Sequence, residues 1–277
     1  GKTDLGIALA KKYDGEIISA DSRQVYKKMN IGTAKPKADF RLQTSDSDDN
    51  AYAVEGIPHY LIDIIDPRKD FSLAEFKEKA INCINDIIKR GNLPIIVGGT
   101  GLYIWAIVDN LNIPNTPPSK ELRRELEKKD LNELAGLLKK IDPDSAEKID
   151  IKNPRRVLRA LEVFILSGKP FFNQRTKSNP LFDCLQIGID LPREELYARI
   201  NKRVDTQIEQ GLTEEVKKLV KQKYGWNLPS MSGIGYKQMG YYLRGEKSLE
   251  EAVEILKKDT RHYAKKQMTW FKRDKRI

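Results

Sequence analysis

Hydrophobic positions follow two patterns along the chain, and each predicts a different kind of element. Short, mainly apolar runs bounded by polar residues are typical of buried strands. Such runs occur at 16–20, 58–67 and 93–97. Elsewhere apolar residues recur three or four positions apart, as on the buried face of an amphipathic helix. The stretch 72–91 is the clearest helix, because Ser72 and Glu75 form a capping box at its start and Gly91 ends it.

The predicted strands are separated by helices, and each leads into a polar or glycine-rich turn. The run 16–20 continues into Asp21, and the run 93–97 continues into Gly-Gly-Thr-Gly at 98–101. This order predicts an α/β fold with a parallel sheet and helices on both of its faces. Open α/β sheets hold ligands at the carboxyl ends of their strands, which makes Asp21 a candidate site residue. The alternative is that Asp21 or Ser22 merely caps the next helix.

The middle of the chain has helical spacing without strand-like alternation. Pro114, Pro117 and Pro118 mark a boundary. Helices are expected at 119–129, 131–141 and 154–167, the last of them capped by Asn153 with Pro154 in its first turn. A strand-like run at 183–190 then returns the chain to the sheet. The predicted division is a core of 1–113 and 181–277 interrupted by an all-helical insertion of 114–180.

The C-terminal part predicts further helices, and one earlier segment predicts none. Helices are expected at 192–210 and 213–224, and a long last helix begins with the capping box of Ser248 and Glu251. The segment 37–56 is polar and irregular, which is typical of an exposed, mobile loop.

The formal net charge of +10 is concentrated in two segments. Residues 120–180 carry 15 basic and 10 acidic groups, a sum of +5, and residues 257–277 carry 9 and 2, a sum of +7. Concentrated positive charge favours a polyanionic partner, because neutralised phosphates release counterions. A solvated lysine-rich surface is the alternative. In the last helix, the interleaved His262, Tyr263, Trp270 and Phe271 favour an RNA-facing surface.

Composition excludes several classes of protein. With 39% hydrophobic and 32% charged residues among 277, the chain is neither disordered nor a membrane protein. No run approaches the ~18 consecutive apolar residues that span a bilayer. The two cysteines, Cys83 and Cys184, are isolated among apolar residues, so we expect small core residues in a reducing, cytoplasmic compartment. Nothing in the sequence predicts an oligomer, and a monomer is expected.

The chain begins with Gly1-Lys2-Thr3 directly before a helical pattern. This string is similar to the tail of the phosphate-binding loop G-x-x-x-x-G-K-[ST]. In that loop backbone N–H groups cradle phosphates, the lysine reaches the outer phosphates and the hydroxyl binds Mg²⁺. The expected sheet is therefore P-loop NTPase-like. We expect further glycines of this loop before Gly1 and a basic tail after Ile277.

Several strings together resemble one family, the tRNA dimethylallyltransferases, also called tRNA isopentenyltransferases. They occur in family order across nearly the whole chain, which makes the set far more specific than any one string. The strings lie at 1–3, 19–26, 30–35, 58–67, 97–103, 153–162, 203–205 with 211–212, 235–238 and 260–271. Two features depart from the family pattern: the segment 37–56 is longer and more acidic than expected, and Tyr60 stands where a second histidine is common.

The resemblance implies an activity. Enzymes of this family transfer a dimethylallyl group from dimethylallyl diphosphate to the exocyclic amine of the adenine 3′ of the anticodon in tRNA, with Mg²⁺ as cofactor. The phosphate-binding loop at 1–3 is of a nucleotide-binding, ATP-binding type. In this family it would hold a prenyl diphosphate rather than drive ATP hydrolysis. The expected partners are therefore the anticodon stem-loop of tRNA and dimethylallyl diphosphate, and no membrane.

The resemblance also implies roles for matched residues. Asp21 is expected to be the general base for the adenine amine, and Thr100 is expected to position that amine. The diphosphate would be held by Gly1, Lys2, Thr3 and Arg203, with Thr3 as a Mg²⁺ contact. Expected tRNA contacts are Asp21, Ser22, Arg23, Gln24, Thr100, Arg123, Arg155, Arg156, Val157, Leu158, Arg159, Ser232, Gly233, Ile234, Gly235, Tyr236 and Lys237.

Two other classes of function compete with this interpretation. A P-loop small-molecule kinase shares an α/β core with a helical insertion and predicts phosphoryl transfer from ATP. It leaves the strings at 21–26 and 260–271 unexplained. A non-catalytic RNA-binding protein explains the charge but gives the pair Asp21 and Thr100 no purpose.

Overall fold

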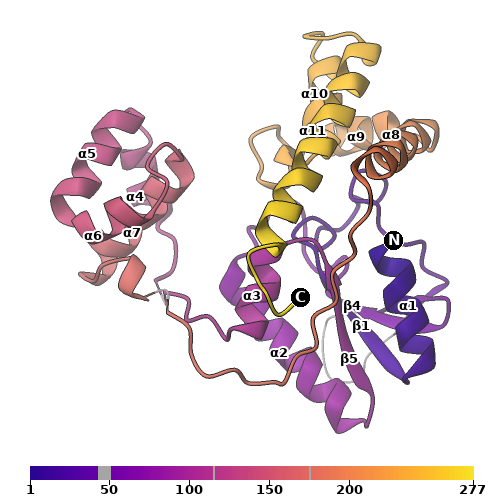
Figure 1. Ribbon diagram of the computed structural model, residues 1–277. Coiled ribbons are helices and arrows are strands. Elements are labelled where there is room, and N and C mark those ends of the chain that lie inside the picture. Colours follow the sequence, from indigo (N-terminus) through magenta and orange to yellow (C-terminus); the bar gives the residue numbers. More distant parts are fainter. Residues whose placement is uncertain (43–50, 115, 175) are drawn as a thin grey trace. The chain divides into compact units, whose positions relative to one another are not determined.

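The structure is a computed structural model that describes residues 1–42, 51–114, 116–174 and 176–277 (Figure 1). These residues form two compact units. Gly1–Ile104 and Cys184–Ile277 make up the first, called the core unit below, and Trp105–Asp183 make up the second, called the helical unit. The sequence predicted the boundaries at 113/114 and 180/181, whereas the units divide at 104/105 and 183/184.

The described part of the core unit contains a five-stranded mixed sheet in the order β2-β3-β4-β1-β5. The strands are β1 (Gly15–Ala20), β2 (Phe40–Leu42), β3 (Ala51–Val54), β4 (Ile57–Tyr60) and β5 (Leu93–Gly98). β1 is parallel to both β4 and β5, and Ala20 pairs with Gly98 at the carboxyl end. β2 and β3 are antiparallel. The predicted parallel sheet is therefore confirmed for β4, β1 and β5.

Helices cover the central strands because those strands are apolar on both faces. All six residues of β1 are buried. On one face α1 (Lys2–Lys12) buries Ile7 and Ala10 against Ile17. On the other face lies α2 (Leu73–Lys89) (Figure 1). The Ser72 hydroxyl accepts a hydrogen bond from the Glu75 N–H at the start of α2, which confirms the predicted capping box.

Two predictions for the core unit were wrong. The segment 37–56, interpreted as an irregular loop, contributes β2 and β3, whose antiparallel pairing uses backbone groups that polar residues also supply. Residues 43–50 of this segment lie outside the described part.

The run 183–190, interpreted as a strand, pairs with no strand in the described residues. Leu185 is 88% exposed and Ile187 58% exposed. Alternating apolar residues form a strand only where a partner edge is present. Cys83 and Cys184, expected in the core, are half-buried.

The C-terminal helices share a hydrophobic core with the segment that follows β1. They are α8 (Arg193–Glu209), α9 (Leu212–Lys221), the short helix η2 (Ser230–Ser232), α10 (Tyr236–Leu243) and α11 (Leu249–Phe271). Val25, Tyr26 and Met29 pack into this core with residues such as Leu212 and Met239. The packing fixes the chain immediately after Asp21, and this is how the fold positions the candidate site.

In the helical unit the described elements are all helical. They are α4 (Lys120–Leu126), α5 (Leu131–Ile141), α6 (Pro143–Lys148), α7 (Pro154–Ser167) and the short helix η1 (Phe172–Gln174). α3 (Gly101–Val108) begins in the core unit and ends in the helical unit. Asn153 caps α7 by accepting from the N–H groups of Arg155 and Arg156, as predicted. Leu126, Leu138 and Leu161 pack together in the hydrophobic core of the helical unit.

No helix in the described residues is long and apolar enough to cross a membrane.

Candidate active site

The site forms where the carboxyl ends of β1 and β5 meet. Asp21 follows β1 and Thr100 follows β5, and the two strands are in parallel register at Ala20 and Gly98. The Thr100 N–H donates to the Ala20 carbonyl (3.2 Å), and the Ser22 N–H donates to Thr100 Oγ1 (3.1 Å). These bonds hold the turn containing Asp21 beside Thr100. The structure therefore brings together the two residues that the resemblance named as catalytic.

Asp21 also closes its own turn, which gives weight to the capping alternative. Its Oδ1 accepts from the N–H of Arg23 (2.8 Å) and from the N–H of Gln24 (3.4 Å). Both bonds go to one carboxylate oxygen. A cap through Oδ1 and a chemical role through Oδ2 are therefore compatible, and a substitution that keeps Oδ1 separates the two.

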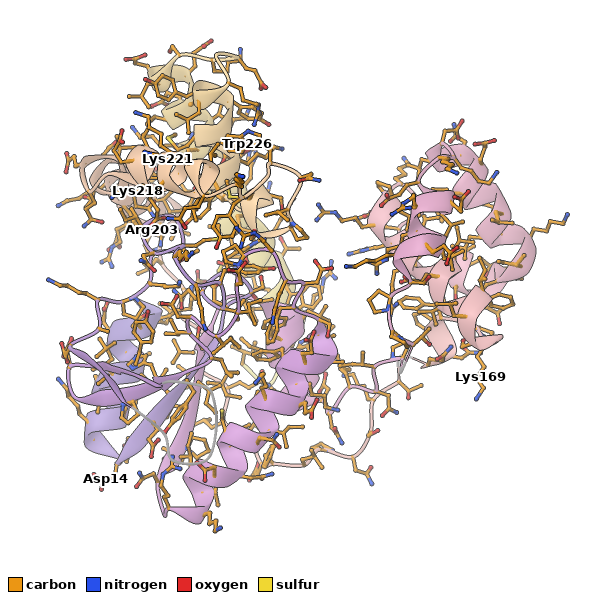
Figure 2. All side chains as sticks on the ribbon, turned by 180° about the vertical axis from the view of Figure 1, so that it is seen from behind. Asp14, Lys169, Arg203, Lys218, Lys221 and Trp226 are labelled. Atoms are coloured by element: carbon orange, nitrogen blue, oxygen red, sulfur yellow. The ribbon has the colours of Figure 1, made fainter. Side chains whose placement is uncertain are left out.

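Two cations face Asp21. Lys2 lies in the first turn of α1 and Arg203 on α8 (Figure 2). Both side chains are exposed as a whole, yet the protein around their charged ends partly desolvates them, which lowers the pKa of Lys2 and of Arg203. The Asp21 carboxylate opposes the shift at both residues, and the Arg203 charge adds to it at Lys2. Because these two neighbouring cations are partly removed from water, the site that they form favours the binding of an anion.

The last helix supplies two site residues: Tyr263, which the sequence predicted only as part of an RNA-facing surface, and Gln267, which was not a candidate. Gln267 on α11 donates to the Gly99 carbonyl (2.9 Å). Partial burial and the Asp21 charge raise the pKa of Tyr263, while hydrogen bonds with Gln267 and Thr100 act in the opposite direction. Tyr263, on α11, therefore lies close to Asp21 and Thr100. The spacing of 263, 267 and 270, which places them on one helix face, is the signal that could have found them.

The glycines after β5 allow this close approach of α11. A Cβ on Gly101 would lie 2.3 Å from Cδ1 of Trp270, and a Cβ on Gly98 would lie 2.2 Å from the Ala20 carbonyl oxygen. In the structure these glycines make room for β1 and for α11.

Residues 22–24 hold neighbouring loops in place. The guanidinium of Arg23 donates to the Pro229 carbonyl (2.6 Å) and to Ser232 Oγ (3.5 Å). The amide of Gln24 donates to the carbonyls of Thr33 and Ala34. Arg23 thereby ties the Asp21 turn to the turn at 229–235 that begins α10.

In that turn only part of the predicted tRNA surface is accessible. Tyr236 is 1% exposed, and its hydroxyl donates to Glu215 Oε1 (2.6 Å), while burial raises its pKa. Gly233 and Gly235 are buried, Ser232 and Ile234 are half-buried and Lys237 is exposed. Gly235 has a φ of +97°, a conformation that favours glycine. Tyr236 thus packs inside the core, which leaves Lys237 as the exposed cation of this turn.

The arginines of the helical unit divide into two groups. Arg123 and Arg159 both bind Glu162, which is fully buried, with nitrogen–oxygen distances of 2.9 Å and 2.6 Å. Arg155 and Arg156 are exposed at the start of α7.

The two apolar positions predicted beside these arginines lie away from solvent. Val157 is fully buried in the core of the helical unit, and Leu158 is half-buried against the same core. A tRNA contact through the Val157 side chain is therefore not supported.

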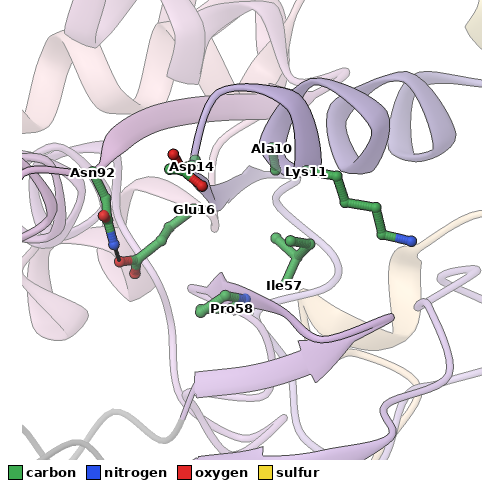
Figure 3. A pocket seen from close by; sticks show the side chains of 8 residues that line it. Ala10, Lys11, Asp14, Glu16, Ile57, Pro58 and Asn92 are labelled. Atoms are coloured by element: carbon green, nitrogen blue, oxygen red, sulfur yellow. Dashed lines mark hydrogen bonds between the residues drawn. The ribbon is translucent and has the colours of Figure 1, made fainter.

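A pocket at the opposite end of the sheet is structural (Figure 3). It lies where β1 and β5 begin, and Glu16 lines it. Burial opposes ionisation of Glu16, but hydrogen bonds from Tyr60 (2.5 Å), Asn92 (2.6 Å) and Arg90 (2.8 Å) outweigh it and lower the pKa of Glu16. A carboxylate so fully bonded holds strand ends together and leaves little capacity for a ligand.

No group of three or more His, Cys, Asp or Glu side chains suited to a metal ion occurs among the described residues. Magnesium commonly binds through one or two protein oxygens and the phosphates of a substrate. The hydroxyl of Thr3, which is half-buried beside Lys2, is an oxygen ligand of that kind. The donor set thus fits a Mg²⁺ ion that arrives with a diphosphate.

Comparisons with known proteins agree on one family. The chain matches the family model described as IPP transferase over residues 24–274. A relative named tRNA dimethylallyltransferase, from Acetivibrio thermocellus, is 50% identical over 99% of this chain and 85% of its own length.

Solved structures give the same result. The tRNA delta(2)-isopentenylpyrophosphate transferase of Staphylococcus epidermidis is 42% identical, with a TM-score of 0.65 over 98% of this chain and 86% of that one. A eukaryotic dimethylallyltransferase, described in the act of modifying tRNA, is 31% identical, with a TM-score of 0.79 over 98% of this chain and 67% of that one.

Proposed function

The chain belongs to the IPP transferase family, and we propose that it is a tRNA dimethylallyltransferase whose donor is dimethylallyl diphosphate. It modifies tRNA at the exocyclic amine of the adenine 3′ of the anticodon. The observation that carries this proposal is the meeting of Asp21 and Thr100 with the two cations Lys2 and Arg203 at one end of the sheet.

The reaction needs an acceptor for a proton and a stabiliser for a leaving anion. The adenine nitrogen forms a bond to C1 of the dimethylallyl group while the bond from C1 to the diphosphate oxygen breaks. The oxygen leaves with the bonding electron pair, and the charge that develops on it is stabilised by Lys2 and Arg203. The proton of the amine passes to the Asp21 carboxylate. Thr100, held by Ser22 and Ala20, positions the amine.

The diphosphate site is built on α1. Backbone N–H groups at Gly1 and the start of α1 point to the amino end of the helix, where an anion is favoured. The Thr3 hydroxyl would hold Mg²⁺, which would neutralise charge on the diphosphate when it is bound.

The tRNA-binding role rests on exposed residues of both units. Arg155, Arg156 and Lys237 are exposed cations that suit phosphate contacts. Arg123 and Arg159 share their guanidinium groups with Glu162 and hold α4 against α7, so their direct share in binding is smaller. Ser22, Arg23 and Gln24 stand next to the position that an extruded adenine must enter. A tRNA substrate also agrees with the cytoplasmic location that the cysteine content predicts.

A transfer assay tests the proposal. Full-length enzyme is incubated with labelled dimethylallyl diphosphate, Mg²⁺ and an unmodified anticodon stem-loop that has adenine 3′ of the anticodon. Label is expected in the RNA, and none is expected when purine riboside, which lacks the amine, replaces that adenine. Phosphorylation of a nucleoside from ATP without label transfer would favour a kinase. Binding of the RNA with neither reaction would favour a non-catalytic RNA-binding protein.

A further inference from the structure

A second pocket in the core unit, separate from the Asp21 site, combines aromatic and cationic side chains. Its volume is about 380 Å³, within the roughly 300–1,000 Å³ that is usual for small-molecule sites. It is lined by Trp226, Asn227, Met231, Ser232, Lys237, Tyr241 and Arg244. Of these described lining residues two are cationic and none carries a carboxylate. Such a pocket suits a flat ring joined to an anion.

The fold holds the aromatic and cationic groups close together. The Arg244 guanidinium lies 4.9 Å from the Trp226 ring centre and 5.7 Å from that of Tyr241, and Lys237 Nζ lies 5.8 Å from the Tyr241 ring. A Cβ on Gly240 would lie 2.9 Å from Cζ3 of Trp226 and 3.0 Å from Nη1 of Arg244. Glycine at 240 therefore lets both side chains pack against α10.

The orientation of Arg244 is fixed by a neighbour outside the pocket lining. Glu246 accepts from Nε (2.5 Å) and Nη2 (3.1 Å) of Arg244, and that pair raises the pKa of Arg244. A guanidinium held in this way keeps its position beside the indole of Trp226 and directs Nη1, which is outside the pair with Glu246, to a ligand. Trp226 lies in the segment between α9 and α10 (Figure 2).

One residue joins this pocket to the candidate active site. Ser232 lines the pocket and accepts from Arg23, and the N–H of Arg23 donates to Asp21. Arg23 therefore links the pocket wall to the turn that contains Asp21. A ligand bound in this pocket would therefore lie beside the RNA strand that enters the active site.

We propose that this pocket binds one unpaired nucleotide of the tRNA next to the reactive adenine, with its base against Trp226 and Tyr241 and its phosphate against Lys237 and Arg244. The inference rests on the proposed function. Extruding one adenine from the anticodon loop unstacks its neighbours, which then need new stacking partners. Aromatic side chains and arginine supply such stacking for single-stranded bases, and nearby cations bind the connected phosphate.

The test compares Trp226→Ala with Tyr13→Ala, which removes an exposed aromatic ring at the end of α1. Binding of an anticodon stem-loop RNA is measured at fixed salt. The Kd is expected to rise about tenfold for Trp226→Ala, the effect of one lost base–aromatic stack, and to change less than twofold for Tyr13→Ala. Trp226→Phe, which keeps a ring, is expected to recover most of the affinity.

Abasic substitutions identify the occupant. Each nucleotide flanking the reactive adenine is replaced in turn by an abasic one. At one position the loss is expected to be about tenfold for the wild-type protein and near zero for Trp226→Ala, because the ring and the base belong to the same contact. Abasic losses that are equal in both proteins at every position would overturn the proposal.

The outcomes separate this inference from the proposed function. Absence of dimethylallyl transfer by the wild-type protein would refute the function. Normal transfer, together with unchanged RNA affinity of a Trp226→Ala protein that melts like the wild type, would refute only the pocket. If Trp226→Ala does not fold, Arg244→Gln replaces it, with an expected loss of about threefold and a salt slope smaller by about one. An unchanged slope would refute the phosphate contact.

Discussion

At the scale of single residues, the Asp21 carboxylate both caps a turn and faces two cations. Its Oδ1 closes the turn by accepting from Arg23 and Gln24, while its charge faces Lys2 and Arg203. The sequence could place Asp21 after a strand but could not choose between cap and base. The structure shows the cap, and substitution of Asp21 tests its chemical role.

Asp21→Asn keeps the accepting Oδ1 and removes the charge. We expect turnover to fall by about 10² to 10⁴-fold, the usual contribution of a positioned general base, with tRNA affinity within threefold of the wild type and an unchanged melting temperature. Single-turnover transfer kinetics and RNA binding measure the two effects. Asp21→Ala, the control, additionally costs about 1 kcal/mol of stability because the cap is lost. Equal losses of turnover and of tRNA affinity in Asp21→Asn would show that Asp21 acts structurally.

Lys2 illustrates how a binding residue lowers stability until its ligand arrives. Its folded pKa lies below the ordinary value of 10.5, so in the pH range just below 10.5 the unfolded chain binds more protons than the folded one. The Lys2 contribution to stability therefore rises with pH through that range. Lys2→Met is expected to remove this rise and to melt no lower than the wild type at pH 7.

The same variant should lose its response to ligand. Wild-type protein is expected to melt at a higher temperature in the presence of inorganic diphosphate, whereas Lys2→Met is not, because the anion has lost a cation. Differential scanning fluorimetry with and without diphosphate measures both effects. Lys202→Met, an exposed lysine on α8 beside Arg203 in sequence, serves as the control. Full diphosphate stabilisation of Lys2→Met would contradict the assignment.

At the scale of elements, helices were easier to predict than strands. The helices α5 and α7 begin and end at the predicted residues, because capping and apolar spacing are local properties of the chain. The strands β2 and β3 were missed and a strand at 183–190 was expected in error. A strand depends on a distant partner, which local patterns do not contain.

Glu162 organises the helical unit. Its carboxylate binds Arg123 on α4, Arg159 on α7 and the N–H of Ser119. Burial alone would raise its pKa, but the two arginines together lower it. Glu162→Gln is expected to destabilise this unit by about 2 kcal/mol at pH 7, since two cations lose their charged partner.

The acid sensitivity of the helical unit should change with it. A carboxylate with a lowered folded pKa contributes stability above its unfolded value near 4.5 and loses it as the pH falls through the folded pKa. Urea unfolding with hydrogen exchange in α7 at pH 7 and at pH 3 is expected to show a smaller acid loss in Glu162→Gln. The exposed Glu147→Gln on α6 should behave as the wild type. Equal acid losses in all three proteins would contradict the role of Glu162.

At the scale of the whole molecule, positive charge is supplied by two separate stretches of sequence. Residues 120–180 sum to +5 and residues 257–277 to +7, and they belong to the helical unit and to the core unit. Two of the positive charges in residues 120–180 are paired within the protein, because Arg123 and Arg159 form ion pairs with Glu162. The charge that remains exposed, including Arg155 and Arg156, is the part available to a polyanion.

Arg155→Ala and Lys265→Ala are therefore expected to weaken tRNA binding several-fold. Each should also reduce the slope of log Kd against log salt concentration by about one, since each removes one phosphate contact. Filter binding over a range of salt concentrations measures the slope. The control is Lys89→Ala at the end of α2, an exposed lysine in a part of the chain without excess charge. Slopes equal to that of Lys89→Ala would rule out these contacts.

The sequence by itself determined the helices with their caps, the parallel strand core, the concentration of charge and, through resemblance, the family and the pair Asp21 and Thr100. These depend on short-range periodicity or on strings that keep their order. Only the tertiary structure decided that Tyr263 and Gln267 join the site, that Tyr236 and Val157 are buried, and that Glu162 binds two of the predicted RNA-contacting arginines. Those outcomes depend on which side chains meet across long separations in sequence, where packing and charge pairing decide rather than local pattern.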